Sequence, residues 1–125
     1  MKQNLLSDGE WKLMNLLWDA APLTIGDMVN ALREDTAWTK ATVNIMLNRL
    51  AEKGAVRVDT GGRAKRFYPL LRREEAVRLE AKSCLRKIKT GGIGLLLSTM
   101  AEDCDLSDAE IDELYRILKE GRGNG

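Results

Sequence analysis

The stretch TKATVNIMLNRLAEKGAVRVDTGGRAKRFYP, residues 39–69, changes the spacing of its apolar residues partway along. Up to Lys53 the apolar residues recur with the period of a helix, about 3.6 residues, and Gly54 suits the left-handed conformation that ends many helices. After Gly54 the period becomes about two, which is typical of a β-strand. The stretch therefore predicts a helix that is followed at once by a small β-structure.

A basic hairpin is predicted after Gly54. Val56 and Val58 alternate with charged residues in the first strand, and residues 65–68 (KRFY) form the returning strand. Residues 60–63 (TGGR) are predicted to make a tight turn, because glycine adopts the backbone angles that such turns need. The basic side chains of this hairpin are Arg57, Arg63, Lys65 and Arg66.

Two more helices are predicted before this stretch. Ser7 and Glu10 have the spacing of a capping box, which opens the first helix, and Thr24 with Asp27 opens the second. Three helices followed by a glycine-tipped hairpin describe a winged helix-turn-helix. The predicted fold class is therefore mainly α with a small β-hairpin, in which residues 1–71 form a winged-helix DNA-binding domain. The tryptophans Trp11, Trp18 and Trp38 are expected to serve core or interdomain packing.

The outer face of the third helix differs from an ordinary water-facing surface. The helical period predicts a core stripe of Val43, Met46, Leu47 and Leu50. The opposite face carries Ala41, Ile45, Asn48 and Glu52, with Thr42 and Asn44 at its sides. An exposed isoleucine beside asparagines suits a DNA major groove, because thymine presents a methyl group there and asparagine can bond two edges of adenine. Residues 39–48 are therefore predicted to enter the groove.

The charge distribution agrees with a polyanionic partner. The net charge is only +1, but residues 33–89 contain fifteen Lys and Arg against seven Asp and Glu. Residues 1–32 and 90–125 are both net acidic, so their charges offset those of the basic segment in the net charge of the chain. Because phosphate contacts supply much of the affinity of DNA-binding proteins, the middle of the chain is predicted to face nucleic acid.

Residues 72–120 are predicted to form helices that each carry one narrow apolar stripe. Residues 91–94 (GGIG) interrupt the helical pattern, and Ser107 with Glu110 makes a second capping box. Because these stripes have no core of their own, we expect a helical dimerisation domain that pairs with a second copy; the alternative is that it folds back on the N-terminal part of its own chain. The predicted dimer contacts are Val77, Ala81, Leu85, Ile88, Leu95, Leu96, Ile111, Leu114 and Leu118. Residues 121–125 are expected to be a disordered tail.

Composition argues against several other functions. The chain has no histidine, no phosphate-binding glycine–lysine loop and no carboxylate pair placed to converge on a substrate, so catalysis is not expected. Cys84 and Cys104 are isolated, so idle thiols are expected in place of a disulfide, and neither a metal site nor a cofactor is predicted. No apolar run is long enough for a membrane span and no secretory signal is recognised, which predicts a cytoplasmic protein.

Four segments together resemble the penicillinase-repressor family, which includes the β-lactamase, methicillin-resistance and copper-responsive repressors. They are residues 7–18 (SDGEWKLMNLLW), 39–56 (TKATVNIMLNRLAEKGAV), 62–76 (GRAKRFYPLLRREEA) and 106–118 (LSDAEIDELYRIL). The likeness runs from Leu6 to Lys119, nearly the whole chain. It implies a dimeric winged-helix repressor that binds a palindromic operator and blocks transcription.

The resemblance also implies which residues meet the DNA. The groove-reading positions of the family match Ala41, Thr42, Asn44 and Ile45, while Arg49 and the hairpin fall beside the phosphate backbone. Well-known members carry a basic residue, a glutamine and a threonine at the positions of Ala41, Asn44 and Ile45, so a different operator half-site is expected. The full set of predicted DNA contacts is Thr39, Lys40, Ala41, Thr42, Asn44, Ile45, Asn48, Arg49, Arg57, Arg63, Lys65 and Arg66.

In the β-lactam branch the resemblance implies relief of repression by cleavage of an Asn-Phe bond, signalled by a membrane sensor protease. The matching pair here is Thr99-Met100, so neither residue is retained, and the cysteine pairs of the copper branch are absent as well. Two other interpretations stay open. A winged helix that binds protein would use Ile45 as an interface anchor, and a small-molecule-sensing repressor would need a pocket near Trp38 or at the dimer interface.

Overall fold

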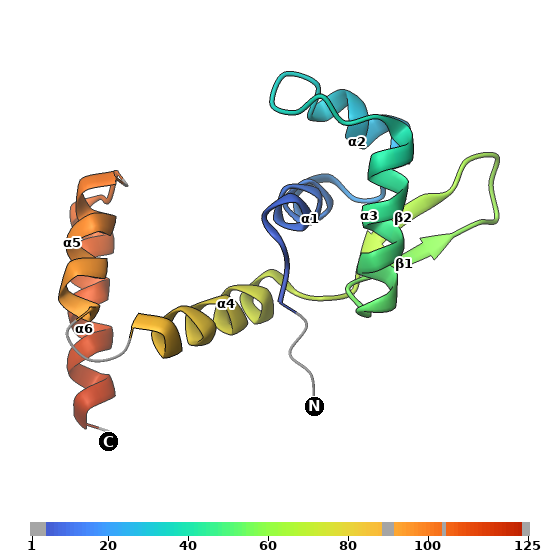
Figure 1. Cartoon of the computed structure of the whole chain (residues 1–125). Helices are drawn as coiled ribbons and strands as arrows, with labels where there is room; N and C mark the ends of the chain where they lie inside the picture. Colours follow the sequence, from blue (N-terminus) through green and yellow to red (C-terminus); the bar gives the residue numbers. More distant parts are fainter. Residues whose placement is uncertain (1–4, 89–91, 104, 124–125) are drawn as a thin grey trace. The chain divides into compact units, whose positions relative to one another are not determined.

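The computed structural model describes residues 5–88, 92–103 and 105–123, and the chain divides into two compact units between Ser83 and Cys84 (Figure 1). The N-terminal unit contains α1 (Asp8–Ala20), α2 (Ile25–Ala31), α3 (Lys40–Glu52), β1 (Val56–Asp59), β2 (Arg66–Pro69) and the first part of α4 (Arg73–Ile88). The C-terminal unit contains the end of α4, α5 (Ile93–Asp103) and α6 (Asp108–Gly123). The order of the elements agrees with the prediction: three helices come first, a two-stranded hairpin follows, and further helices come after it.

Reciprocal caps confirm the predicted starts of the first two helices. At α1 the Ser7 hydroxyl accepts the Glu10 N–H at 3.2 Å, and the Glu10 carboxylate accepts the Ser7 N–H at 2.9 Å. Thr24 and Asp27 make the same pair at α2, at 3.0 Å in each direction. These bonds satisfy backbone donors that the first turn of a helix leaves without a partner. Because only a few residue types at this spacing can form them, the caps could be predicted from the sequence.

The third helix, α3, also begins and ends where its sequence predicts. The Thr39 hydroxyl accepts the Thr42 N–H at 3.2 Å, and Gly54, just past the helix, has a φ of +79°. Glycine adopts this left-handed angle without strain because it has no Cβ. The predicted core stripe is confirmed, with Val43, Leu47 and Leu50 fully buried and Met46 half-buried.

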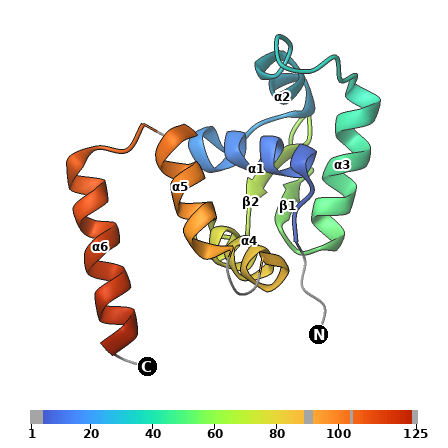
Figure 2. The same ribbon diagram turned by 60° about the vertical axis from the view of Figure 1, so that its left-hand side comes forward.

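One core lies between the three helices and the hairpin of the N-terminal unit, and Figure 2 shows α1, α3 and the two strands gathered around it. Its fully buried side chains are Leu13, Met14, Leu17, Met28, Val43, Leu47 and Leu50. Val56 and Phe67 close the core from the two strands. The packing role predicted for Trp11, Trp18 and Trp38 is confirmed, because all three lie partly buried against this core.

The hairpin has a longer tip than predicted. Val56 pairs with Pro69 and Asp59 with Arg66, so six residues, 60–65, connect the strands. The prediction of a tight turn at residues 60–63 was therefore wrong. At the end of β1 the Asp59 carboxylate accepts the Gly61 N–H at 2.9 Å, a local side-chain turn that starts this longer connection.

A third extended segment was not predicted. Leu23, between α1 and α2, forms an antiparallel bridge with Phe67: the Phe67 N–H donates to the Leu23 carbonyl at 2.8 Å, and the Leu23 N–H donates back at 3.3 Å. A single bridging residue carries no two-residue alternation, so sequence spacing cannot reveal it. The bridge ties the start of α2 to the hairpin and so helps to place the two beside each other.

The first part of α4 packs on the N-terminal unit, which corrects the predicted boundary at residues 71 and 72. Ala76 is only 3% exposed and belongs to the core, and Ser83 is buried as well. The expectation that the whole of residues 72–120 lacks a core to pack on was therefore wrong for this face of α4. The neighbouring stripe, with Val77, Ala81 and Leu85, is exposed.

The C-terminal unit has little interior of its own. Among its residues with described side chains none is buried, and its exposed apolar residues include Leu95 at 71% and Tyr115 at 67%. The second capping box is confirmed, because the Ser107 hydroxyl accepts the Glu110 N–H at 3.1 Å and the Glu110 carboxylate accepts the Ser107 N–H at 2.9 Å. α6 continues to Gly123, so residues 121–123 are helical in place of the expected tail. In the described ranges, no helix has the length and apolar character that a membrane crossing requires.

A buried ion pair joins α1 to the end of α3. Glu10 is 2% exposed, and the Lys53 Nζ lies 2.5 Å from its Oε1 while also donating to the Leu5 carbonyl at 2.9 Å. Burial alone would raise the pKa of Glu10, but the hydrogen bonds from Lys53 and Ser7 and the charge of Lys53 outweigh it, so the pKa lies below its ordinary value. The charged form is therefore the one that stabilises the fold.

We expect Glu10→Gln to lower the free energy of unfolding by about 1–3 kcal/mol at pH 7, because Lys53 loses its charged partner. A carboxyl whose pKa is depressed by folding contributes stability above its unfolded value and loses it as the pH falls through the folded value. The gap between wild type and variant in urea unfolding should therefore close below the ordinary Glu value of 4.5. Glu34→Gln, at an exposed site, is the control. An equal gap at pH 7 and pH 3 would contradict this role for the Glu10 charge.

Candidate nucleic-acid interface

The outer face of α3 is open to solvent, as predicted. Ile45 is 54% exposed, Ala41 and Asn48 are exposed, and Thr42 and Asn44 are half-buried at its sides. In the part of the chain that the structure describes, neither the Asn44 nor the Asn48 side chain has a hydrogen-bond partner. An α-helix with this face fits the major groove of DNA, which is about 12 Å wide. In such a groove, the unpaired amides of Asn44 and Asn48 and the apolar side chain of Ile45 can contact the edges of bases.

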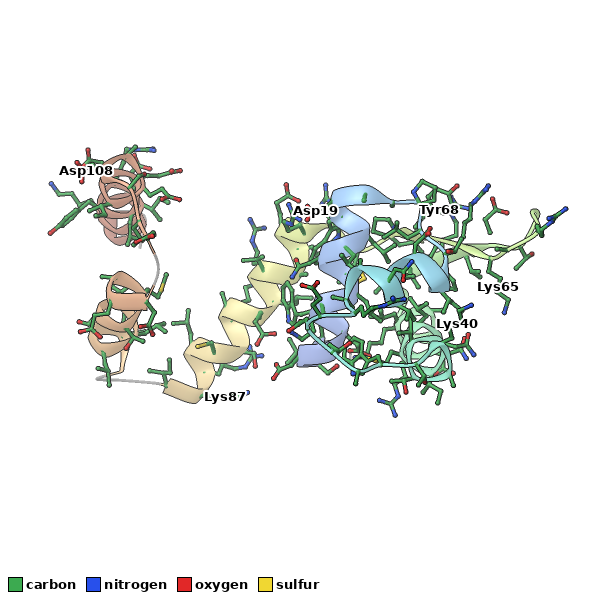
Figure 3. All side chains as sticks on the ribbon, turned by 90° about the horizontal axis from the view of Figure 1, so that it is seen from above. Asp19, Lys40, Lys65, Tyr68, Lys87 and Asp108 are labelled. Carbon is green, nitrogen blue, oxygen red and sulfur yellow. The ribbon has the colours of Figure 1, made fainter. Side chains whose placement is uncertain are left out.

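A groove of about 470 Å³ opens beside this face, between α2, α3 and the tip of the hairpin. Its lining residues are Thr24, Ile25, Gly26, Lys40, Ala41, Asn44, Ala64 and Lys65. Lys40 and Lys65, labelled in Figure 3, therefore reach the same groove from different elements. The structure thus brings three of the predicted contacts on α3, Lys40, Ala41 and Asn44, together with Lys65 from the hairpin.

The contribution of α2 to this groove was not predicted. Thr24 was recognised as a helix cap, but its capping pattern says nothing about which surface the start of α2 joins. The packing of α2 on α3 and the bridge from Leu23 to β2 decide that placement.

The basic residues that are predicted to contact DNA keep their charge available. They are Lys40, Arg49, Arg57, Arg63, Lys65 and Arg66, and all six are exposed. Across the described ranges none of them forms an ion pair, whereas the same unit pairs Lys12 with Asp35, Lys53 with Glu10 and Arg73 with Asp19. Positive charges that form no ion pair attract a polyanion more strongly than charges that are already paired.

One of these residues has a defined position on the hairpin. The Arg57 guanidinium lies over the ring of Tyr68, 4.2 Å from its centroid, and the two residues are directly paired across the strands. A cation–π contact of this kind holds the side chain against the strand without neutralising its charge. Arg57 is thereby oriented while its N–H donors stay free for phosphate oxygens.

The other predicted site residues lie on α4, α5 and α6. Of the predicted dimer contacts, Val77, Ala81, Leu85, Leu95 and Ile111 are exposed, Ile88, Leu96 and Leu114 are half-buried, and the side chain of Leu118 is outside the described part. Ile111, Leu114 and Tyr115 of α6 line an apolar hollow together with Leu97 of α5. Thr99 and Met100 are exposed within α5. Cys84 is half-buried and unbridged, and Cys104 lies outside the described residues.

The chain matches known proteins along nearly its whole length. The family model "Penicillinase repressor" matches residues 6–120. The "Penicillinase repressor" of Bacillus licheniformis is 28% identical over 115 residues, which are 92% of this chain and 90% of that protein. The "Methicillin resistance regulatory protein MecI" of Mammaliicoccus sciuri is 26% identical over 113 residues, 90% of this chain and 92% of that one.

A solved structure matches the N-terminal part. It is the solution structure of the Bacillus licheniformis BlaI monomeric form in complex with the blaP half-operator, with a TM-score of 0.51 and 26% identity. The match covers 59% of this chain and 90% of that chain. More than half of this chain thus shares its fold with a protein that was solved in complex with a half-operator.

Proposed function

The chain belongs to the penicillinase repressor family, and on this premise we propose that it is a DNA-binding transcriptional repressor whose α3 enters the major groove. The observation that carries the proposal is the outer face of α3: Ile45 is 54% exposed, and the unpaired amides of Asn44 and Asn48 lie beside it. Base edges offer partners for both kinds of side chain.

In this proposal the contacts divide into two classes. The groove-reading side chains are Ala41, Thr42, Asn44, Ile45 and Asn48. The phosphate-binding groups are Thr39, Lys40, Arg49, Arg57, Arg63, Lys65 and Arg66. Phosphate contacts position the protein and set affinity, whereas base contacts choose the sequence. We assign the thymine methyl to Ile45 and adenine edges to the asparagines, because these groups match in chemistry.

We also propose that two chains bind one palindromic operator. The exposed apolar stripe of α4 with Val77, Ala81 and Leu85, and the exposed Leu95 and Ile111, support a contact between two copies. Apolar side chains without an interior are stabilised when a second copy covers them, and a two-fold dimer presents two recognition helices to two half-sites. Operator palindromes follow from that symmetry.

The base contacts are tested on the duplex that the protein selects from a random pool. Asn44→Ala or Asn48→Ala should cost about 1–3 kcal/mol on the selected site and leave binding to random DNA unchanged, because random sites do not satisfy the amides. Ile45→Ala should lose discrimination between thymine and uracil at one position, since the two bases differ only by the methyl group. Leu70→Ala, which is also 54% exposed but follows β2, is the control. Equal losses on selected and random duplexes would contradict the groove assignment.

Relief of repression by a membrane sensor protease stays a prediction of the resemblance. Thr99 and Met100 lie in the middle of α5, where the Thr99 hydroxyl donates to the Leu95 carbonyl at 2.8 Å. A protease needs an extended backbone, so α5 would have to unwind before cleavage at this bond. Incubation with the cognate sensor, followed by mass analysis of the repressor, tests the prediction: a cut at residues 99–100 supports it, and an intact chain after induction contradicts it.

A further inference from the structure

Two tryptophans of α1 hold the beginning of α4. The Trp18 Nε1–H donates to the Leu71 carbonyl at 2.8 Å. The Arg73 guanidinium lies over the Trp18 ring, 5.4 Å from its centroid, and donates to the Asp19 carboxylate at 2.8 Å. The first turn of α4 is therefore attached to α1 by a hydrogen bond, a cation–π contact and an ion pair at one place.

A second attachment lies further along the same helix. The Trp11 Nε1–H donates to the Glu80 carboxylate at 3.4 Å, and the Trp11 ring meets the Trp18 ring edge-on with centroids 5.8 Å apart. Between the two attachments Ala76 is buried in the core. Arg73 and Glu80 are separated by about 10 Å along a helix axis, at about 1.5 Å per residue. Attachment at two such points opposes a swing of the helix about either one.

We call these contacts of Trp11, Trp18 and Asp19 with Leu71, Arg73 and Glu80 the α1–α4 latch. The latch lies apart from the groove between α2, α3 and the hairpin tip, and its residues are not among the proposed DNA contacts. The partners of its two tryptophan N–H donors and both members of its ion pair lie within the N-terminal unit. What it determines is the direction in which α4 leaves the core that also holds α3.

That direction matters because α4 continues as one helix from Arg73 to Ile88 and carries the exposed stripe that includes Val77, Ala81 and Leu85. We propose that Trp11 and Trp18 are positioning residues that set the spacing between the two operator half-sites. This inference rests on the proposed function, since it requires dimeric binding to a palindrome. One added base pair shifts a half-site by roughly 3.4 Å and rotates it by roughly 35°. A rigid connection accepts one spacing, whereas a loosened one accepts several.

The test uses the full-length dimer and the palindrome selected from random DNA. Variants of that duplex have one or two base pairs added or removed at the centre, and a single half-site serves as reference. We expect the wild type to lose about tenfold in affinity per base pair of mismatch, as the second half-site moves out of reach. In the double variant Trp11→Phe with Trp18→Phe, a smaller aromatic ring remains at each position but both N–H donors are lost. Its loss per base pair should shrink to about threefold or less, with half-site affinity unchanged within about twofold.

Two controls keep the result interpretable. Trp38→Phe alters a tryptophan that packs on the same core but is not part of the latch, and it should keep the wild-type spacing preference. Arg73→Gln removes the ion pair and the cation–π contact at a half-exposed position and leaves both tryptophans in place, and it should also flatten the preference. If both latch variants discriminate spacings as steeply as the wild type, the inference is overturned. If the wild type fails to bind the half-site at all, the proposed function fails instead.

Discussion

A negative charge on the apolar faces of α5 and α6 is expected to lower the affinity for a palindromic operator by on the order of 10²–10⁴-fold. Leu95→Glu and Ile111→Glu place the charge at side chains that are 71% and 39% exposed. A dimer contact would bury the charge without a partner, which costs far more than its apolar gain. Two separate chains would then bind the two half-sites independently. The gain in affinity that comes from joining two DNA-binding domains in one dimer would be lost.

The measurement pairs sedimentation with duplex binding. The two variants should sediment as single chains at micromolar concentration and keep wild-type affinity for a half-site duplex. Lys119→Glu, which also introduces a negative charge but on the charged side of α6, is the matched control and should leave the dimer intact. A wild-type mass equal to one chain, or a variant that remains dimeric, would remove the dimer from the proposal.

Salt is expected to weaken binding to a half-site duplex by on the order of 10³-fold between 50 and 200 mM, provided that about six basic residues of one protomer contact phosphates. The reason is that each neutralised phosphate releases a condensed counterion, and the release becomes less favourable as salt rises. The logarithm of the affinity should fall with the logarithm of the salt concentration at a slope of roughly −5. A protein-binding winged helix would instead show little affinity for any duplex at either concentration.

The variant Arg63→Ala shows which residues produce that slope. Arg63 lies at the exposed tip of the hairpin without an ion-pair partner in the described structure, so its removal should flatten the slope by about one and weaken selected and random duplexes alike. Arg78→Ala, at an exposed position on α4, is the control and should leave the slope unchanged. If both variants reduced the slope equally, the phosphate contacts would not be specific to the hairpin.

Local patterns explain why so much of the fold could be predicted. Ser7 with Glu10, Thr24 with Asp27, and Gly54 with its positive φ act within one turn of chain, so their effect is independent of distant residues. The inward and outward faces of α3 follow from the helical period in the same way, which is why the exposed position of Ile45 was predictable.

The features that sequence spacing could not supply join elements far apart along the chain. Leu23 meets Phe67 through backbone groups alone, and the inner face of α4 with Ala76 is chosen by the shape of the core that receives it. The apolar period of α4 permits more than one buried face, because both Ala76 and Val77 belong to stripes at helical spacing.

The sequence by itself determined the helices, the hairpin and the outer face of α3, because caps, turns and periodicity are set by neighbours a few residues away. The tertiary structure alone decided that α2 joins the groove beside Lys40 and Lys65, and that Trp11 and Trp18 hold α4. Those arrangements depend on which surfaces fill the space left by other elements. The close packing of the whole core selects these arrangements, so they cannot be predicted from the spacing of neighbouring residues.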